Sequence, residues 1–191
     1  MFDPTKTIQI NLIRPGGDVS FVCPWPTDEQ LIERSRNRKI LGGAVSEAAI
    51  EDNDSRNRAQ DLAWLKQLSP DAVEIDDYEA SDVCAKLLSV EAGVPSRVAG
   101  RIEVSLSTVF GEIPVVLRIP ARSAIAEYEK TIIAKRDVRG VREITMRLEA
   151  GAKLYDAIVD SPQVLPIIYK VAACGAVVNY LESLRSATVN P

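Results

Sequence analysis

The chain has 191 residues, with 23 basic and 27 acidic side chains and a net charge of −4; apolar residues make up 46% and charged residues 26%. This composition is typical of a soluble globular protein of one domain or two small ones, and the acidic balance argues against a broad nucleic-acid-binding surface. There is no histidine, which removes Ser-His-Asp catalysis, the usual zinc sites and the commonest general base.

The first predicted element is a β-hairpin. Residues 7–13 (TIQINLI) alternate strand formers with polar residues, which is the period of a half-buried strand. A turn follows at 14–18, where Gly17 supplies a positive φ, and residues 19–23 return as the second strand. Pro26 then helps to stop the pairing, because proline has no backbone N–H to donate.

Helices are predicted for the rest of the first half. Thr27 is the expected N-cap of the first helix, with Gln30 completing a capping box, and the helix should end near Leu41, before a glycine pair. Residues 43–55 are small, acidic and polar, and we expect a connector there. Two further helices are predicted over residues 57–68 and 77–92.

The second half repeats this plan. Strands are expected at 101–108 and 112–119, on either side of a turn that contains Gly111, and Pro120 precedes the next helix. Three helices are predicted, over residues 121–135, 139–159 and 165–184.

An internal match connects the two halves. Residues 8–33 lie over residues 102–127 without a gap, at an offset of 94. The turn glycines and the prolines before the helices fall in register: Gly17 with Gly111, and Pro26 with Pro120. We therefore predict the α+β class, with two tandem pseudo-repeats that each contain a β-hairpin followed by about three helices.

The expected domains are the two halves, residues 1–95 and 96–191. No apolar run approaches the roughly 18 residues of a membrane span, and the opening MFDPTKT lacks the apolar core of a signal peptide. We therefore expect a cytoplasmic protein without a membrane partner. The three cysteines are far apart and should be reduced and buried: Cys23, Cys84 and Cys174.

Three clusters of charged residues are candidate sites. Arg34, Arg38 and Lys39, late in the first helix, are either contacts to a phosphate or acidic partner, or a solvated face favoured by the helix dipole. The acidic residues between 74 and 82 lack the glycine and bidentate glutamate of a calcium loop, and are better explained as a charged helix start. Asp156 and Asp160 are expected to face solvent as a pair. We predict no catalytic, cofactor-binding or metal-binding residue and no cofactor.

The opening TIQINLIRPGGDVSFVCPWPTDEQLIERSRNRK, a second strand–proline–helix block and a helical tail resemble the tail assembly chaperones encoded beside tail genes in bacteriophages and prophages. This resemblance implies a non-enzymatic protein of the bacterial cytoplasm that keeps tail proteins soluble during assembly. It implies a protein partner and is compatible with an oligomer. We expect no nucleic-acid partner.

Two alternatives belong to other classes. A structural tail or connector component would remain in the phage particle, whereas a chaperone would not. A small-molecule enzyme using carboxylate or cysteine chemistry would need a deep pocket with perturbed titrating groups, whereas an assembly protein would show an exposed apolar surface.

Overall fold

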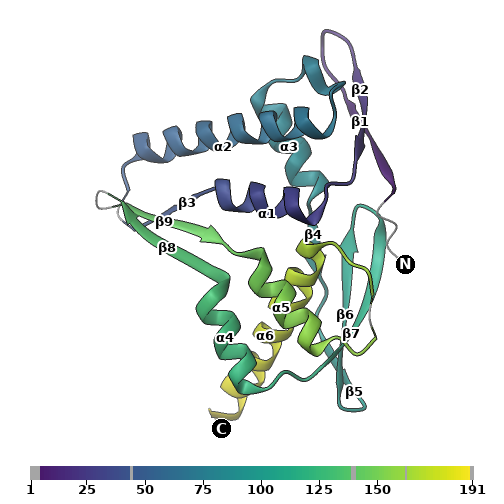
Figure 1. Cartoon of the computed structure of the whole chain (residues 1–191), viewed down its shortest axis with the longest axis vertical. Coiled ribbons are helices and arrows are strands. Elements are labelled where there is room, and N and C mark those ends of the chain that lie inside the picture. The colour runs from purple at the N-terminus through teal and green to yellow at the C-terminus, as the bar shows by residue number, and fades with distance from the viewer. Residues whose placement is uncertain (1–4, 44, 139–140, 162, 190–191) are drawn as a thin grey trace. The chain divides into compact units, whose positions relative to one another are not determined.

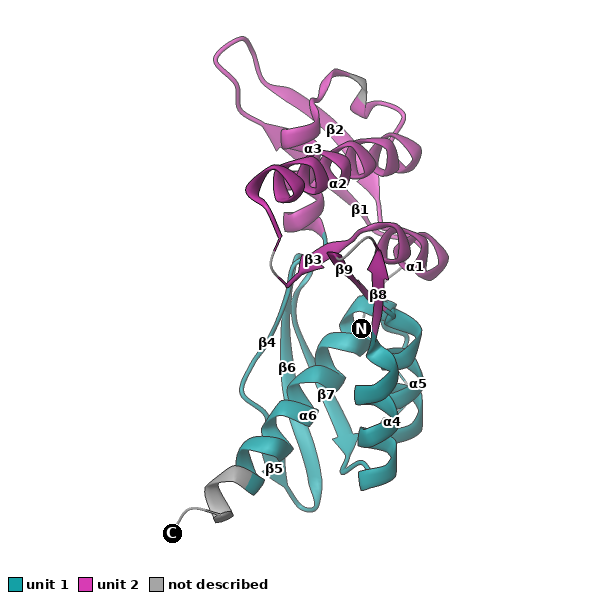
Figure 2. Ribbon diagram, turned by 90° about the vertical axis from the view of Figure 1, so that its left-hand side faces the viewer, with its two compact units in different colours: residues 1–2, 88–133, 147–191 teal, residues 3–87, 134–146 magenta. Residues whose placement is uncertain are grey.

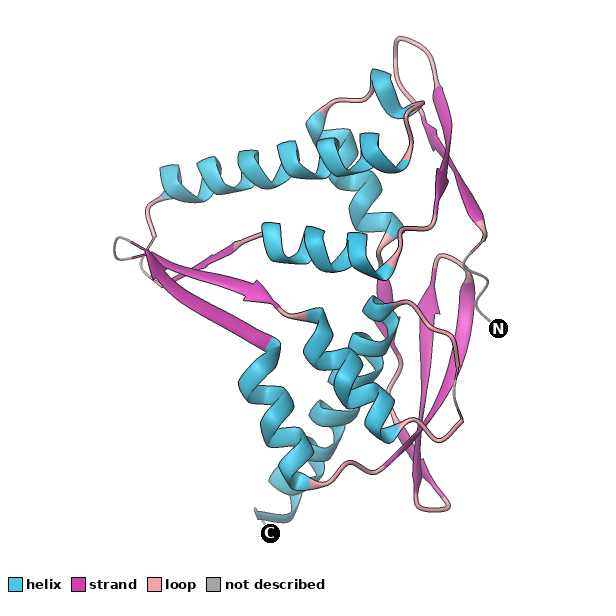
Figure 3. Cartoon of the chain, in the orientation of Figure 1, coloured by secondary structure: helices cyan, strands magenta, loops and turns pink. Residues whose placement is uncertain are grey.

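The structure is a computed structural model that describes residues 5–43, 45–138, 141–161 and 163–189. Within this part of the chain it contains six α-helices, one short 3₁₀ turn and nine strands, and it belongs to the α+β class as predicted (Figures 1 and 3).

The first half of the chain contains a hairpin, three helices and one further strand. In chain order these are β1 (Thr7–Leu12), β2 (Val19–Pro24), α1 (Asp28–Asn37), β3 (Ile40–Gly42), α2 (Glu47–Leu68), the 3₁₀ turn (Ala72–Glu74) and α3 (Asp77–Leu87).

The rest of the chain, from residue 88 onward, contains more strands. In chain order its elements are β4 (Val90–Ala92), β5 (Ser96–Val98), β6 (Arg101–Thr108), β7 (Gly111–Arg118), α4 (Arg122–Ile132), β8 (Ile133–Val138), β9 (Val141–Met146), α5 (Leu148–Ile158) and α6 (Ile167–Val189).

These elements form two compact units (Figure 2). Unit 2 contains the described residues up to Leu87 together with those between Ala134 and Met146, and unit 1 contains those of 88–133 and those from Arg147 onward. The units differ from the expected halves in two places. β4 pairs with β6, which brings residues 88–95 into unit 1, and β9 pairs with β3, which brings a segment of the second half into unit 2.

Unit 1 is a small antiparallel sheet covered by helices. β6 is its central strand and pairs with β7 on one edge and with β4 and β5 on the other. The inward side chains of β6 are fully buried, and α6 packs against both β4 and β6. Alternation of apolar and polar residues along β6 produces this one-sided burial.

Unit 2 has two small sheets. The β1–β2 hairpin is one of them, and β3, β9 and β8 form the other, with β9 in the middle. α2 and α3 pack against each other, and their buried side chains include Leu65, Leu68, Val83 and Leu87. Burying each such side chain contributes about 1.5–3 kcal/mol to folding before the entropic cost is counted.

The two hairpins have the same register. Adding 94 to both members of every β1–β2 pair gives a β6–β7 pair, so that Ile8 opposite Cys23 becomes Ile102 opposite Leu117. The turn glycines both have positive φ, of 123° at Gly17 and 96° at Gly111. These φ values suit glycine because it has no Cβ to clash.

The correspondence continues into the helices. The same shift carries the first residue of α1 onto the first residue of α4, and Pro26 and Pro120 are both buried two positions before these helices begin. A shift of 90 carries the start of α3 onto the start of α6. That shift also carries the buried positions in the last part of α2 onto buried positions of α5: Asp61, Trp64, Leu65 and Leu68 onto Gly151, Leu154, Tyr155 and Ile158.

The predicted repeat is nevertheless not confirmed over whole halves. From residue 88 onward the chain contains β4, β5 and β9, for which the described residues before it have no counterpart, and α6 has 23 residues where α3 has 11. The shared part is a hairpin, a helix, a short strand and two more helices.

The prediction of a connector over residues 43–55 is wrong, because α2 begins at Glu47. Ser46 caps it by accepting a hydrogen bond from the backbone N–H of Ala49. The inner positions of this part of α2 are Asn53 and Asn57, so it has no apolar stripe by which the pattern could reveal a helix.

The prediction of one helix over residues 139–159 is also wrong in its first part, since Val141–Met146 form β9 and α5 begins at Leu148. Three other helices end earlier than expected. The ends of the predicted helices at 27–41, 77–92 and 121–135 are instead the strands β3, β4 and β8. β3 pairs with the distant β9, β4 pairs with β6, and β8 pairs with the next strand, β9. Such pairing overrides local propensity.

Candidate functional site

The β1–β2 hairpin presents an incompletely covered apolar row. Ile8, Ile10 and Leu12 alternate along β1 and point toward the core face, yet all three are only half-buried. Their positions at the shift of 94 in β6 are Ile102, Val104 and Leu106, which are 0%, 3% and 0% exposed. The same pattern of side chains is therefore covered in unit 1 and partly uncovered in unit 2.

The backbone of β1 also has an open edge. β1 pairs with β2, and among the described residues no strand pairs with its other edge. β6, by contrast, pairs with strands on both edges. An unpaired strand edge presents a row of N–H and C=O groups that can bind another chain.

The tip of the hairpin is tied to α3. The Arg14 guanidinium binds the Glu79 carboxylate, with Nε 2.6 Å from Oε1, and donates to the Glu74 carbonyl at 2.9 Å. The bond to Glu79 raises the pKa of Arg14. Beside this anchor Ile13 is 89% exposed. The tip is thus held in place while it presents an apolar side chain to solvent.

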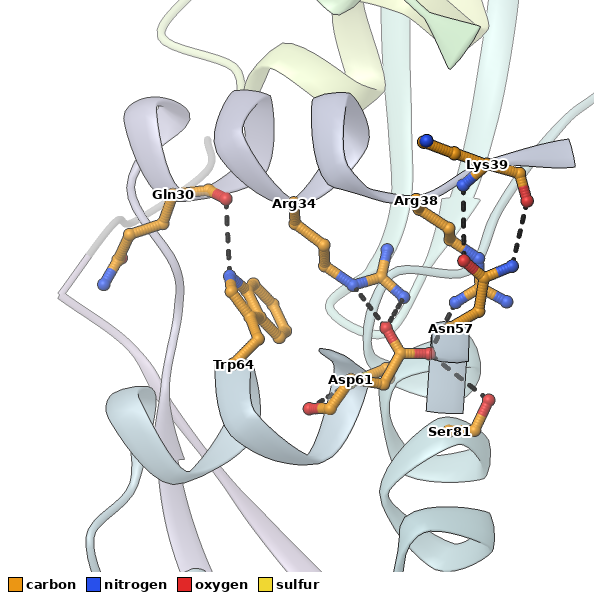
Figure 4. A network of polar contacts seen from close by, with 9 residues as sticks. Gln30, Arg34, Arg38, Lys39, Asn57, Asp61, Trp64 and Ser81 are labelled. Atoms are coloured by element: carbon orange, nitrogen blue, oxygen red, sulfur yellow. Dashed lines mark hydrogen bonds and ion pairs between the residues drawn. The ribbon is translucent and has the colours of Figure 1, made fainter. Parts of the chain in front are cut away.

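The second candidate feature is a buried carboxylate between α1 and α2 (Figure 4). Asp61 on α2 has a side chain only 2% exposed and binds two arginines: Arg34 of α1, whose Nη2 is 2.7 Å from Oδ1, and Arg38, the C-cap of α1. Ser81 on α3 donates a third hydrogen bond at 3.3 Å. A buried carboxylate needs such partners because desolvation penalises its charged form.

Aromatic and amide groups extend this network. The Arg34 guanidinium lies 5.2 Å from the centre of the Trp64 ring, and the Trp64 indole donates to the Gln30 carbonyl at 3.3 Å (Figure 4). Asn57 accepts from the backbone N–H of Lys39 at 3.3 Å and donates to its carbonyl at 2.9 Å. The network therefore fixes the end of α1 and the start of β3 against α2.

The three residues predicted to contact a partner bind acidic side chains of the chain itself. Arg34 and Arg38 share Asp61, and the Lys39 ammonium binds Glu143 of β9 at 2.9 Å. Arg34 is mostly buried, whereas the side chains of Arg38 and Lys39 are 40% and 35% exposed. A contact of these two exposed cations with a partner stays a prediction. Their shown role is to join α1 and β3 to α2 and β9.

Each unit has a shallow groove between corresponding helices. The groove of unit 2 measures about 140 Å³, and its lining includes Arg34, Arg38, Asp61 and Trp64. The groove of unit 1, between α4 and α5, measures about 100 Å³ and is lined mainly by apolar and small side chains, including Tyr128 and Leu154. The two grooves lie at equivalent positions of their helices. Charged and polar side chains line the groove of unit 2, whereas mainly apolar and small side chains line that of unit 1. The polar network is therefore particular to unit 2.

The cysteines are free and buried, as predicted. Burial raises the pKa of Cys23 to about 11, and raises those of Cys84 and Cys174 to about 12. The thiols therefore stay protonated near neutral pH, and a protonated thiol is a poor nucleophile. Cys84 and Cys174 correspond at the shift of 90, and each contacts a backbone carbonyl of the preceding helix.

The acidic residues of α3 and α5 bind cations of the chain. Glu79 binds Arg14, and Asp77 lies 3.4 Å from Arg58. Asp156 and Asp160, expected as a solvent-facing pair, bind Lys170 and Arg101 respectively; the Asp156 side chain is 63% exposed, as expected, whereas that of Asp160 is 20% exposed. Within the described residues no three carboxylates or thiols gather in a metal-binding group.

α6 is the one helix of the described chain that is long and apolar enough to cross a membrane, over Ile167–Arg185. Core helices of globular proteins share these features, and α6 has buried side chains inside unit 1: Tyr169, Ala173, Cys174 and Val177.

Comparison with protein-family models, curated proteins and solved structures found no significant match. The function must therefore be argued from the site.

The apolar residues of the hairpin surface are not among the predicted site residues, although the hairpin itself was predicted. Alternation along residues 7–13 predicts a half-buried strand, but it does not say whether anything covers the apolar row of Ile8, Ile10 and Leu12. The Asp61 network was also missed, because its arginines are 23 and 27 residues from the carboxylate.

Proposed function

We propose that this protein is a non-enzymatic assembly protein that binds another protein by surface contact, in the manner of a tail assembly chaperone of a bacteriophage or prophage. The observation that carries the proposal is the β1 strand, with its open edge and its half-buried Ile8, Ile10 and Leu12. A strand with these features is suited to bind an extended part of another chain. A chaperone would use it to hold a tail protein soluble in the cytoplasm until assembly.

The internal repeat is part of this proposal. Each half of the chain would be one copy of a repeat composed of a hairpin, a helix, a short strand and two helices. The shared hairpin register and the matching starts of α1 and α4 support this view. The second copy carries its own covering strands, whereas the first leaves its hairpin available to a partner.

The chemistry of the cysteines favours this proposal over a cysteine enzyme. The raised pKa values of all three buried thiols oppose formation of a thiolate at neutral pH. A structural tail component could use the same surface, but it would keep its partner permanently. Particle composition therefore separates these two roles.

The test is cross-linked capture of partners from the native host with wild-type protein and with the variant Ile10→Ser. Loss of a buried apolar contact in an interface costs more than about 1.4 kcal/mol at important positions, so capture of a tail protein should fall about tenfold or more. Gln9→Ser is the matched control, since Gln9 is exposed on the opposite face of β1, and its capture should equal the wild type.

Circular dichroism and urea unfolding of both variants verify that the fold is kept. The chain should also be absent from purified particles. Equal capture by wild type and Ile10→Ser would contradict the role of the hairpin. Stoichiometric retention in particles would assign the structural role instead.

A further inference from the structure

Unit 1 contains a strand arrangement that indicates what suits the open edge of unit 2. Beside β6, residues 90–98 run antiparallel along the edge opposite β7, with Ala92 facing Leu106 and Arg97 facing Ile102. They form two short strands, β4 and β5, separated by Gly93, Val94 and Pro95. The backbone N–H of Gly93 donates to the Ser105 carbonyl at 2.8 Å, so the segment stays attached to β6 through its bulge.

The outer edge of this segment is protected against further pairing. Three residues, 93–95, face only two residues of β6, which is a bulge. Pro95 cannot donate a ladder hydrogen bond, and Glu91 and Arg97 are exposed charges. Bulges, prolines and charges are the devices by which proteins keep sheet edges from associating. The edge of unit 1 is therefore closed.

β1 lacks these devices. The six residues of β1 contain no proline, no glycine and no charge, and the second edge of β1 has no strand among the described residues. The two hairpins share one register, so the open edge of β1 is equivalent to the edge of β6 that residues 90–98 occupy.

The side chains define what an added strand must carry. Ile8, Ile10 and Leu12 are half-buried. Their counterparts in β6 are buried inside unit 1, where the long helix α6 packs against β6. On the opposite face, Gln9 and Asn11 of β1 are exposed and both bond to the Ser20 hydroxyl, at 3.1 and 2.8 Å. A fitting strand is therefore apolar on the face of the row and polar on the other.

We propose that β1 takes up an extended, alternately apolar segment of a client protein as an added antiparallel strand, in the place that residues 90–98 occupy beside β6. This inference rests on the proposed function and specifies its partner. An alternating apolar segment of this kind tends to aggregate when it is unpaired. Main-chain hydrogen bonds to β1 would hold it, and contacts with Ile8, Ile10 and Leu12 would select its apolar face.

The test uses the full chain and a synthetic peptide derived from its own edge strand. The probe has the sequence of residues 88–98 with Ala92→Val and Arg97→Val, because these two positions face the apolar residues Leu106 and Ile102 in unit 1. Hydrogen exchange of residues 7–12 is measured by mass spectrometry with and without peptide. At saturation the β1 amides should exchange about tenfold more slowly, a change of about 1.4 kcal/mol.

Two peptides serve as controls. The unchanged 88–98 sequence should slow exchange less, since its Arg97 would face Ile8, and a scrambled peptide of the same composition as the probe should have no effect. The inference is overturned if the probe leaves β1 exchange unchanged, or slows exchange only elsewhere in the chain.

The failure of this inference can be distinguished from that of the proposed function. If the probe has no effect on β1 but Ile10→Ser still abolishes partner capture, the client contacts the apolar row without adding a strand; the inference fails and the function stands. If the probe slows exchange and Ile10→Ser captures partners normally, β1 accepts strands but is not the assembly surface, and the proposed function fails.

Discussion

The charge of Asp61 is important to unit 2, because the carboxylate is buried and binds two arginines, Arg34 of α1 and Arg38 at the C-cap of α1. Changing Asp61→Asn keeps the shape but removes the charge, and leaves the mostly buried Arg34 uncompensated. Breaking a buried pair in this way costs about 3–5 kcal/mol. We expect urea unfolding of unit 2 to show a loss of about 3 kcal/mol, since Arg38 is partly solvated.

The matched control lies on the same helix. Asp52 forms an i,i+4 ion pair with Arg56, but its side chain is 72% exposed. Asp52→Asn should change the free energy of unfolding by about 0.5 kcal/mol or less, as surface pairs generally do. Equal effects of the two substitutions would show that burial does not set the strength of the Asp61 network.

Burial of the Cys84 thiol predicts that the stability of the fold decreases at alkaline pH. Burial is the main cause that raises its pKa from 9.0 to about 12. Because the folded pKa is the higher one, the stabilisation is fully present below pH 9 and is lost as the pH rises from 9 toward 12, while the unfolded thiol ionises first. In this window the slope from one thiol is about 1.4 kcal/mol per pH unit.

Unfolding measured at several pH values should therefore show a shallower alkaline decline for Cys84→Ala than for the wild type. The slope is the quantity to compare, since the lost side chain also lowers stability at every pH. Between pH 6 and 8 the two proteins should have parallel profiles. Parallel profiles above pH 9 as well would contradict burial of this thiol.

At the scale of the element, the starts of α1 and α4 differ in one chemical respect. Thr27 caps α1 with a complete capping box, in which the Thr27 hydroxyl accepts from the Gln30 N–H and the Gln30 side-chain oxygen accepts from the Thr27 N–H. Ala121, at the shift of 94, is the N-cap of α4 and makes no side-chain cap bond. Side-chain caps contribute about 1 kcal/mol by satisfying backbone N–H groups at the helix start.

Thr27→Ala should therefore destabilise the protein by about 1 kcal/mol, and Ala121→Ser should stabilise it by about 0.5–1 kcal/mol. Thermal unfolding of the two variants beside the wild type measures both changes. A loss of stability in Ala121→Ser would mean that the start of α4 has no unsatisfied group for a cap to bind.

At the scale of the whole molecule, the chain leaves unit 1 after Ile133 and returns at Arg147, having supplied most of β8 and all of β9 to unit 2. The excursion begins and ends at one point of unit 1, since the Arg147 N–H donates to the Ile132 carbonyl at 2.8 Å. In unit 2, the segment pairs with β3, and its Met146 carbonyl accepts from the Ser35 hydroxyl at 2.7 Å.

Replacing residues 133–146 by a short glycine linker should therefore leave unit 1 folded and weaken unit 2. Hydrogen exchange should speed up in β3 and at the end of α1, while the amides of β6 and β7 keep their protection. Exchange that speeds up equally in both units would contradict the division into two units.

The sequence by itself determined the elements whose causes are local. Alternation predicted both hairpins to within one or two residues, the glycines predicted their turns, and Thr27 with Gln30 predicted the start of α1. These signals succeed because a turn, a cap or a strand face depends on residues a few positions apart. The α+β class followed from them.

Only the tertiary structure decided the rest. β3 pairs with the distant β9, and β4 pairs with β6. α2 packs through Asn53, Asn57 and Asp61, whose partners come from α1, α3 and the residues just before β3. The same holds for the candidate surface. Ile8, Ile10 and Leu12 have the pattern of Ile102, Val104 and Leu106, and what differs is the presence of a covering strand and helix. Coverage is a property of neighbours in space, which one strand's own residues do not encode.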